Sequence, residues 1–151
     1  MRILNPTILI SCFIIFTFGG CTKITQTSVG DPIPVIRLVK IEPLSVKQFK
    51  DSLKITFSYE DGDGDLGNIN ADINSLEIKD NRLSKPDMYY IAPLSPNGSV
   101  VHIKGELLFK LRNLFLLGTS NTEKTTLELR IQDRAGHWSN KIITPEITIT
   151  K

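Results

Sequence analysis

The stretch LKITFSY, residues 53–59, decides the fold class, because its side chains alternate strictly between apolar and polar. Successive side chains of a β-strand point to opposite faces of a sheet, so Leu53, Ile55 and Phe57 are expected to face a core. The same period of two recurs in LELRIQ, residues 127–132, and again from Val101 to Phe109. Together these stretches predict an all-β protein.

Weaker strands are expected at residues 35–41, 76–79, 88–91 and 142–149, and a short helical turn at residues 111–117. Pro145 lies inside the last strand. Because proline cannot donate to a ladder, it is expected at a sheet edge or to divide that strand in two. About seven short strands separated by turn residues predict an immunoglobulin-like β-sandwich. This domain would occupy residues 33–151.

The composition is that of one globular domain. The chain has 151 residues, of which 40% are hydrophobic and 23% charged, and a formal net charge of +2. These values exclude a disordered, collagen-like or multi-spanning membrane protein. The near-neutral charge gives no electrostatic reason to expect nucleic acid as a partner. Two cysteines exclude a disulfide-dense scaffold.

The first twenty residues predict an export signal. Arg2 precedes an apolar run from Ile8 to Phe18, which is interrupted only by Ser11 and Thr17. As a helix this run would span roughly 16 Å, about half of a bilayer core. A positive start, a short apolar run and small residues after it are typical of a secretory signal rather than a spanning helix.

Gly19 and Gly20 before Cys21, at the end of this run, resemble the lipobox of bacterial lipoproteins, although Phe18 replaces the usual leucine. In that family a peptidase cuts before the cysteine, which then carries acyl chains, so the resemblance implies a lipid anchor on Cys21. Two or three acyl chains hold a soluble domain on a membrane durably. Residues 21–32 would form the anchor and a tether. The alternative is ordinary cleavage that leaves Cys21 as a free thiol.

An acidic, glycine-rich loop follows the first strand quoted above. Its sequence is DGDGDLG, residues 61–67, and no lysine or arginine lies between Lys54 and Lys79. Carboxylates crowded this closely repel one another, so they need a cation or open water. The acids of the segment are Glu60, Asp61, Asp63, Asp65, Asp72 and Glu77.

The alternation of aspartate and glycine predicts a Ca²⁺ site. Calcium takes six to eight oxygen ligands, and the glycines let the backbone fold around an ion. An EF-hand is excluded because Leu66 stands where that motif needs glycine and a strand precedes the loop. The alternative is a solvated acidic turn in which these residues only make tight bends. The predicted ligands within this segment are Asp61, Asp63, Asp65 and Asp72.

A second turn, DRAGHW at residues 133–138, is expected at the same end of the sandwich. Asp133 is therefore a further candidate ligand, and Arg134 or His137 could contact the acids. The alternative for Asp133 is a turn-forming aspartate that bonds its own backbone. Zinc is disfavoured because the two histidines, His102 and His137, lie far apart in sequence. Magnesium is disfavoured because it tolerates crowded protein cages poorly.

Two blocks carry a second resemblance. YEDGDGDLG, residues 59–67, and DRAGHWSN, residues 133–140, are similar to blocks of uncharacterised Bacteroidota lipoproteins with one immunoglobulin-like domain. The resemblance implies an envelope lipoprotein and carries no activity. Thr22 to Thr25 lack the acidic cluster that resembles a surface-export signal in this group, which favours an outer-membrane anchor facing the periplasm. Asp51-Ser52-Leu53 resembles an O-glycosylation motif of these bacteria, which implies a sugar on Ser52.

The sequence has no nucleophile elbow, HExxH or Walker loop. Acids crowded on one loop suit a metal better than the separated acid and base of a glycosidase. The expected function is a non-enzymatic binding or assembly module of the cell envelope, whose partner is a protein or a glycan. The alternatives are a purely structural envelope component and, less favoured, a carboxylate-dependent glycan hydrolase.

Overall fold

A computed structural model describes residues 30–151 of the chain. The predicted signal peptide, Cys21 and residues 22–29 of the predicted tether lie outside the described residues. Within residues 30–151 there are ten strands and no helix, so no helix of this part is long and apolar enough to cross a membrane. The strands are β1 (Val35–Glu42), β2 (Ser45–Lys47), β3 (Leu53–Asp61), β4 (Leu76–Asp80), β5 (Asp87–Tyr89), β6 (Ile103–Leu111), β7 (Thr122–Thr125), β8 (Leu127–Ile131), β9 (Ile142–Ile143) and β10 (Ile147–Thr150).

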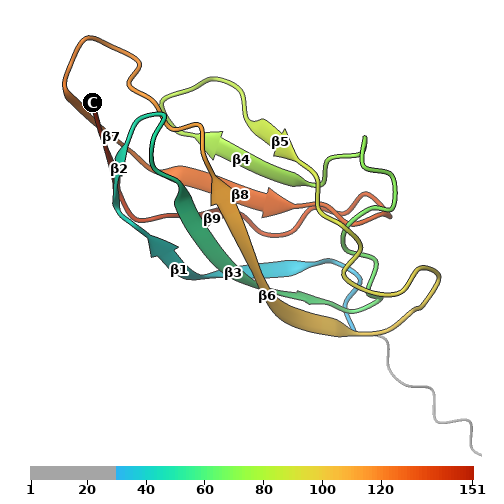
Figure 1. Ribbon diagram of the computed structural model, residues 1–151. Coiled ribbons are helices and arrows are strands. Elements are labelled where there is room, and N and C mark those ends of the chain that lie inside the picture. Colours follow the sequence, from blue (N-terminus) through green and yellow to red (C-terminus); the bar gives the residue numbers. More distant parts are fainter. Residues whose placement is uncertain (1–29) are drawn as a thin grey trace, which may run out of the picture.

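The strands form three sheets, with strand orders β1-β3-β6, β5-β4-β8-β9 and β2-β10-β7. All pairs are antiparallel except β2 with β10, which is parallel. Figure 1 shows β1, β3 and β6 as one layer facing the layer of β4, β5 and β8. The predicted all-β class is confirmed, and the architecture is of sandwich type.

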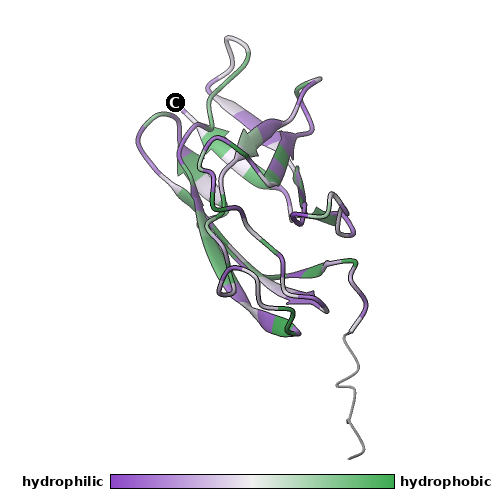
Figure 2. Cartoon of the chain, turned by 90° about the vertical axis from the view of Figure 1, so that its right-hand side faces the viewer, coloured by the Kyte–Doolittle hydropathy of each residue, from purple (hydrophilic) through white to green (hydrophobic). Residues whose placement is uncertain are grey.

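A single apolar core lies between the layers. Leu53, Ile55 and Phe57 of β3 are all 0% exposed, as their alternation predicts. Figure 2 shows hydrophilic and hydrophobic residues interleaved along the strands. Every buried apolar residue of this core lies between Ile36 and Ile149. Within the described residues, the core thus spans nearly the whole length from β1 to β10.

Three details differ from the sequence expectations or refine them. β2 and β7 were not predicted, because β2 has one apolar residue and β7 has none, so neither carries a period-two signal. The predicted helical turn at residues 111–117 does not form. That segment leaves β6 as an irregular loop, and its Phe115 and Leu116 are bonded by the side chains of Arg82 and Gln48. Pro145 separates β9 from β10, as expected for a proline inside a strand pattern.

Candidate metal centre

The candidate site begins at the last residue of β3. Because side chains alternate along the strand, Asp61 falls on the same face as Leu53, Ile55 and Phe57. It is consequently 1% exposed, at the end of the core. The strand pattern thus carries a carboxylate into a position that apolar residues occupy earlier in β3.

Three carboxylates converge at this position. Asp61, Asp63 and Asp65 each offer an oxygen, and these oxygens lie within 4.8 Å of one another. The Oδ1 atom of each residue is buried and has no hydrogen-bond partner within the described part of the chain. Oδ2 of Asp61 accepts from the amide of Leu66 at 3.2 Å, and Oδ2 of Asp65 accepts from the amide of Ala135 at 3.0 Å. An ionised carboxylate oxygen that is buried without a partner is costly, so this cluster could hold a metal ion.

The crowding changes the acidity of the cluster. Burial, followed by the charges of Asp63 and Asp65, raises the pKa of Asp61 from the ordinary 3.8 to about 6. Burial, followed by the charges of Asp133 and Asp63, raises the pKa of Asp65. Both shifts oppose ionisation, and a divalent cation at the centre would reverse them.

The backbone of the loop is fixed by neighbours on several sides. Gly64 has φ of 72°, and a Cβ there would lie 2.2 Å from the carbonyl oxygen of Val101, so only glycine fits. The carbonyl of Asp63 accepts from the amide of Val101 at 3.2 Å, and the carbonyl of Gly64 accepts from the hydroxyl of Ser95. Leu66 is 0% exposed and closes this end of the core. These contacts do not fit a freely solvated turn.

The second predicted turn lies against the first. Asp133 forms a β-bridge with Leu66, and the amide of Arg134 donates to the carbonyl of Asp65 at 3.3 Å. The two oxygens of Asp133 accept from the amide of His137 at 2.7 Å and contact its Nδ1 at 2.9 Å. Asp133 is therefore next to the cluster but is not one of the three converging carboxylates, and its visible role is to hold His137.

The remaining predicted site residues lie elsewhere. Asp72 is exposed, and its amide donates to Oδ1 of Asn70 at 3.0 Å, outside the group of three. Ser52 is half-buried just before β3. His102 contacts Glu60 at 3.1 Å, so the two imidazoles have different carboxylate partners. Cys21 lies outside the described residues.

The chain enters the domain at the same place. The amide of Gly62 donates to the carbonyl of Asp31 at 3.0 Å. A Cβ on Gly62 would lie 2.2 Å from the carbonyl carbon of Gly30, so the backbones at these two glycines pack closely. The segment leading from the predicted anchor is thus fixed to the acidic loop from residue 30 onward.

Sequence reasoning missed two residues that shape this site. Leu66 carried a signal, because it is the one apolar residue in an otherwise acidic and glycine-rich loop. Ser95 carried none, because it reaches the loop from a segment about thirty residues away.

The chain matches no protein-family model, no curated protein and no solved structure. Its function must therefore be argued from the geometry of the site.

Proposed function

We propose that the chain is a lipid-anchored protein of the bacterial cell envelope whose immunoglobulin-like sandwich is a non-enzymatic binding or assembly module stabilised by Ca²⁺. The observation that carries the calcium assignment is the set of buried, unpartnered oxygens on Asp61, Asp63 and Asp65. The lipobox resemblance at Cys21 supports the anchor, and the lack of acidic residues from Thr22 to Thr25 supports an outer membrane facing the periplasm. We propose that this module binds a protein or a glycan of the envelope.

Calcium fits this donor set better than other common metals. The site offers only oxygen ligands in an irregular loop, and Ca²⁺ accepts six to eight oxygens in flexible geometry. Asp63 and Asp65 are only half-buried, which leaves room for water ligands. Zinc prefers imidazole or thiolate, and the imidazoles of His102 and His137 are bonded to Glu60 and Asp133.

The geometry supports a structural role for the ion more than hydrolysis. Glycosidases place an acid and a base on either side of a substrate cleft, in environments that push their pKa values apart. The three oxygens here lie within 4.8 Å of one another. Surface pockets of about 310 and 250 Å³ lie nearby, and neither is lined by Asp61, Asp63 or Asp65.

A bound ion would join parts of both layers. Asp61 ends β3, whereas Asp65 contacts Ala135 of the turn that follows β8. By neutralising the carboxylates, the ion would hold the acidic loop, which follows β3, against the turn that follows β8 in the other layer. Through Gly62 and Asp31 it would also fix the point at which the tether meets the domain.

The calcium assignment is tested by melting residues 22–151 with millimolar Ca²⁺ and with chelator. A ligand at about 100 times its Kd stabilises the folded state by about 2.7 kcal/mol, which is a rise of several degrees in Tm. Asp63→Asn should abolish this rise. Asp72→Asn is the matched control, because Asp72 is exposed and outside the cluster, and it should keep the rise. Equal melting of the wild type with Ca²⁺ and with chelator would refute the assignment.

The anchor is tested separately by Cys21→Ser in the full chain. We expect the wild type to stay with membranes through a high-salt wash and Cys21→Ser to be released by it, because salt weakens electrostatic contacts with lipid but does not remove an acyl anchor. Labelling with radioactive palmitate should mark only the wild type. A Cys21→Ser variant that stays on membranes and keeps the label would show that Cys21 is not the lipid attachment site.

A further inference from the structure

The turn between β2 and β3 exposes an aromatic side chain on a strained backbone. Phe49 has φ of 57°, in the left-handed region that favours glycine or asparagine, and its side chain is 76% exposed. A bulky residue in this region is a genuine outlier. Phe49 is not part of the apolar core, so core packing does not explain this strained conformation, and a role at the surface is the alternative.

The turn is held rigidly in this conformation. The amides of Lys50 and Asp51 donate to the carbonyl of Lys47 at 3.2 and 3.0 Å, and Asp51 accepts from the amide of Lys47 at 2.9 Å. The amide of Gln48 donates to the carbonyl of Thr150 at 2.9 Å. Its side-chain oxygen accepts from the amide of Leu116 at 3.2 Å. The turn is thereby fastened both to β10 and to the loop that follows β6.

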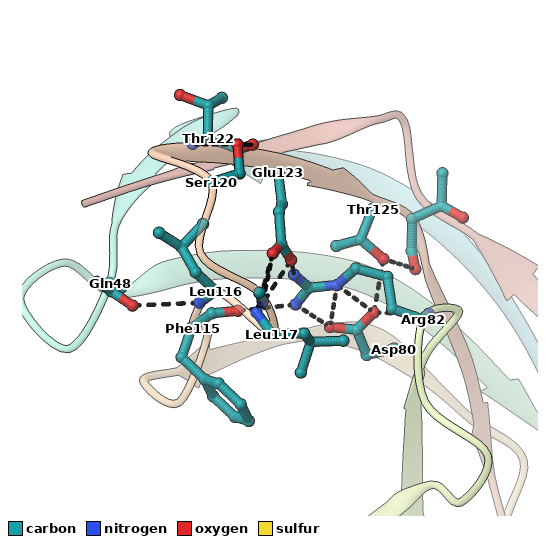
Figure 3. Close-up of polar contacts among 12 residues, drawn as sticks. Gln48, Asp80, Arg82, Phe115, Leu116, Leu117, Ser120, Thr122, Glu123 and Thr125 are labelled. Atoms are coloured by element: carbon teal, nitrogen blue, oxygen red, sulfur yellow. Dashed lines mark hydrogen bonds and ion pairs between the residues drawn. The ribbon is translucent and has the colours of Figure 1, made fainter.

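The exposed ring rests on a second ring. Phe49 stacks on Phe115, with ring centroids 6.0 Å apart and planes 6° from parallel. Figure 3 shows Phe115 beside the cluster of Arg82, Asp80 and Glu123, and the carbonyl of Phe115 accepts from Nη2 of Arg82 at 3.1 Å. Leu117, on the same loop, is 46% exposed. The two stacked rings thus form an apolar tip, and an exposed leucine lies on the adjoining loop.

Exposed cations lie in this turn and at the adjoining ends of β3 and β6. Lys47 and Lys50 flank Phe49 in the turn, Lys54 and Lys110 are paired in register on β3 and β6, and Arg112 follows β6. All five are exposed, and within residues 30–151 none has a carboxylate oxygen within 4.0 Å. The nearby carboxylates bond other groups: Asp51 bonds the turn backbone, Glu42 pairs with Lys40, and Glu123 bonds Arg82 and the amide of Leu117. The surface therefore favours an anionic partner.

We propose that this surface, formed by Phe49, Phe115, Leu117 and the five cations, docks on an anionic lipid bilayer. An exposed phenyl ring enters the acyl boundary while lysines contact lipid phosphates, which is how amphipathic surfaces bind membranes. The polar backbone groups of the turn that are described above are already bonded within the protein, so a hydroxyl-rich glycan would find few partners. In Figure 1 this turn and the acidic loop lie at opposite ends of the domain, so docking is separate from the calcium site.

The proposal is tested with residues 22–151, which include all ten described strands and lack Cys21. The probe is co-sedimentation with vesicles of phosphatidylcholine containing about 30% phosphatidylglycerol, compared with phosphatidylcholine alone. We expect binding only to the anionic vesicles, and release at high salt. Phe49→Asn should weaken binding about tenfold or more while leaving Tm unchanged or higher, because asparagine tolerates the left-handed conformation. Lys47→Glu together with Lys50→Glu should weaken it at least as much.

Two matched controls separate docking from general surface effects. Val100→Asn changes an apolar residue that is 69% exposed beside the acidic loop, and Lys85→Glu reverses an exposed charge in the β4–β5 turn. Both should bind like the wild type. The proposal is overturned if Phe49→Asn binds anionic vesicles as well as the wild type does. It is also overturned if the wild type does not bind anionic vesicles. Binding to an acidic polysaccharide without binding to the vesicles would be such a result.

Discussion

Replacing Arg82 with leucine is expected to lower the free energy of unfolding by about 3 kcal/mol. The side chain of Arg82 is only 15% exposed, and its guanidinium bonds Asp80 at 2.6 Å and Glu123 at 2.6 Å. Burial alone would raise the pKa of Asp80, but hydrogen bonds from Arg82 and Thr125 hold it below its ordinary value. Leucine would leave the buried Asp80 carboxylate with only Thr125 as a side-chain partner. The loss would appear as a drop in Tm of roughly 10 °C.

The same cluster holds the irregular loop that follows β6. Glu123 accepts from the amides of Leu117 and Gly118, and Arg82 bonds the carbonyl of Phe115. The matched control is Lys124→Leu, which removes a cation from an exposed pair with Glu146 and should cost less than about 1 kcal/mol. Urea unfolding of both variants measures the difference. Equal losses would mean that the Arg82 cluster is no more important than a surface ion pair.

The pH dependence of stability is expected to reverse when Ca²⁺ is added. In chelator, the folded-state pKa of Asp61 is about 6, above the ordinary 3.8. The unfolded chain therefore ionises Asp61 more easily, and the penalty for burying its charge is complete above pH 6 and absent below about pH 4. At about 1.4 kcal/mol per pKa unit, the penalty at pH 7 is on the order of 3 kcal/mol. About 1 kcal/mol of it should be relieved between pH 7 and pH 5.

With saturating Ca²⁺ the sign is opposite. The bound ion requires ionised carboxylates, so it lowers their folded-state pKa, and protons compete with it as the pH falls. As the pH falls from 7 to 5, the free energy of unfolding should therefore decrease with Ca²⁺, whereas it should increase in chelator. Thermal or urea unfolding across this range measures both slopes. The control is Asp61→Asn, which keeps His102 and His137 and should lose the difference between the two conditions. Parallel slopes in the wild type would contradict the proposed site.

The alternation of apolar and polar residues predicted the long strands well. β3, β6 and β8 each carry a period of two, because one face of each strand packs in the core. The same period of two also explains the burial of a charged residue, because it places Asp61 on the buried face of β3. The short strand β7 could not be predicted in this way. It has no apolar face, and its backbone pairing with β10 holds it in place.

The candidate site was only partly predictable, because local spacing does not determine where a loop bends. Asp61, Asp63 and Asp65 converge because Gly64 lets the chain turn back upon itself. Asp72 was predicted as a ligand because it belongs to the same acidic segment, but it lies in a separate exposed turn at Asn70, outside the group of three. Asp133 lies next to the loop, as expected, yet its oxygens contact His137, four residues further along the chain. The sequence spacing alone could not show whether Asp133 would bind His137 or a metal ion.

The most direct test of the calcium site is a calorimetric titration of residues 22–151 with CaCl₂ at neutral pH. The account predicts one Ca²⁺ per chain, with a Kd of about 1 mM or lower. Asp61→Asn and Asp63→Asn should lose this binding, and Asp72→Asn should retain it. The account is contradicted if the wild type gives no binding heat at millimolar Ca²⁺, or if Asp63→Asn binds as tightly as the wild type.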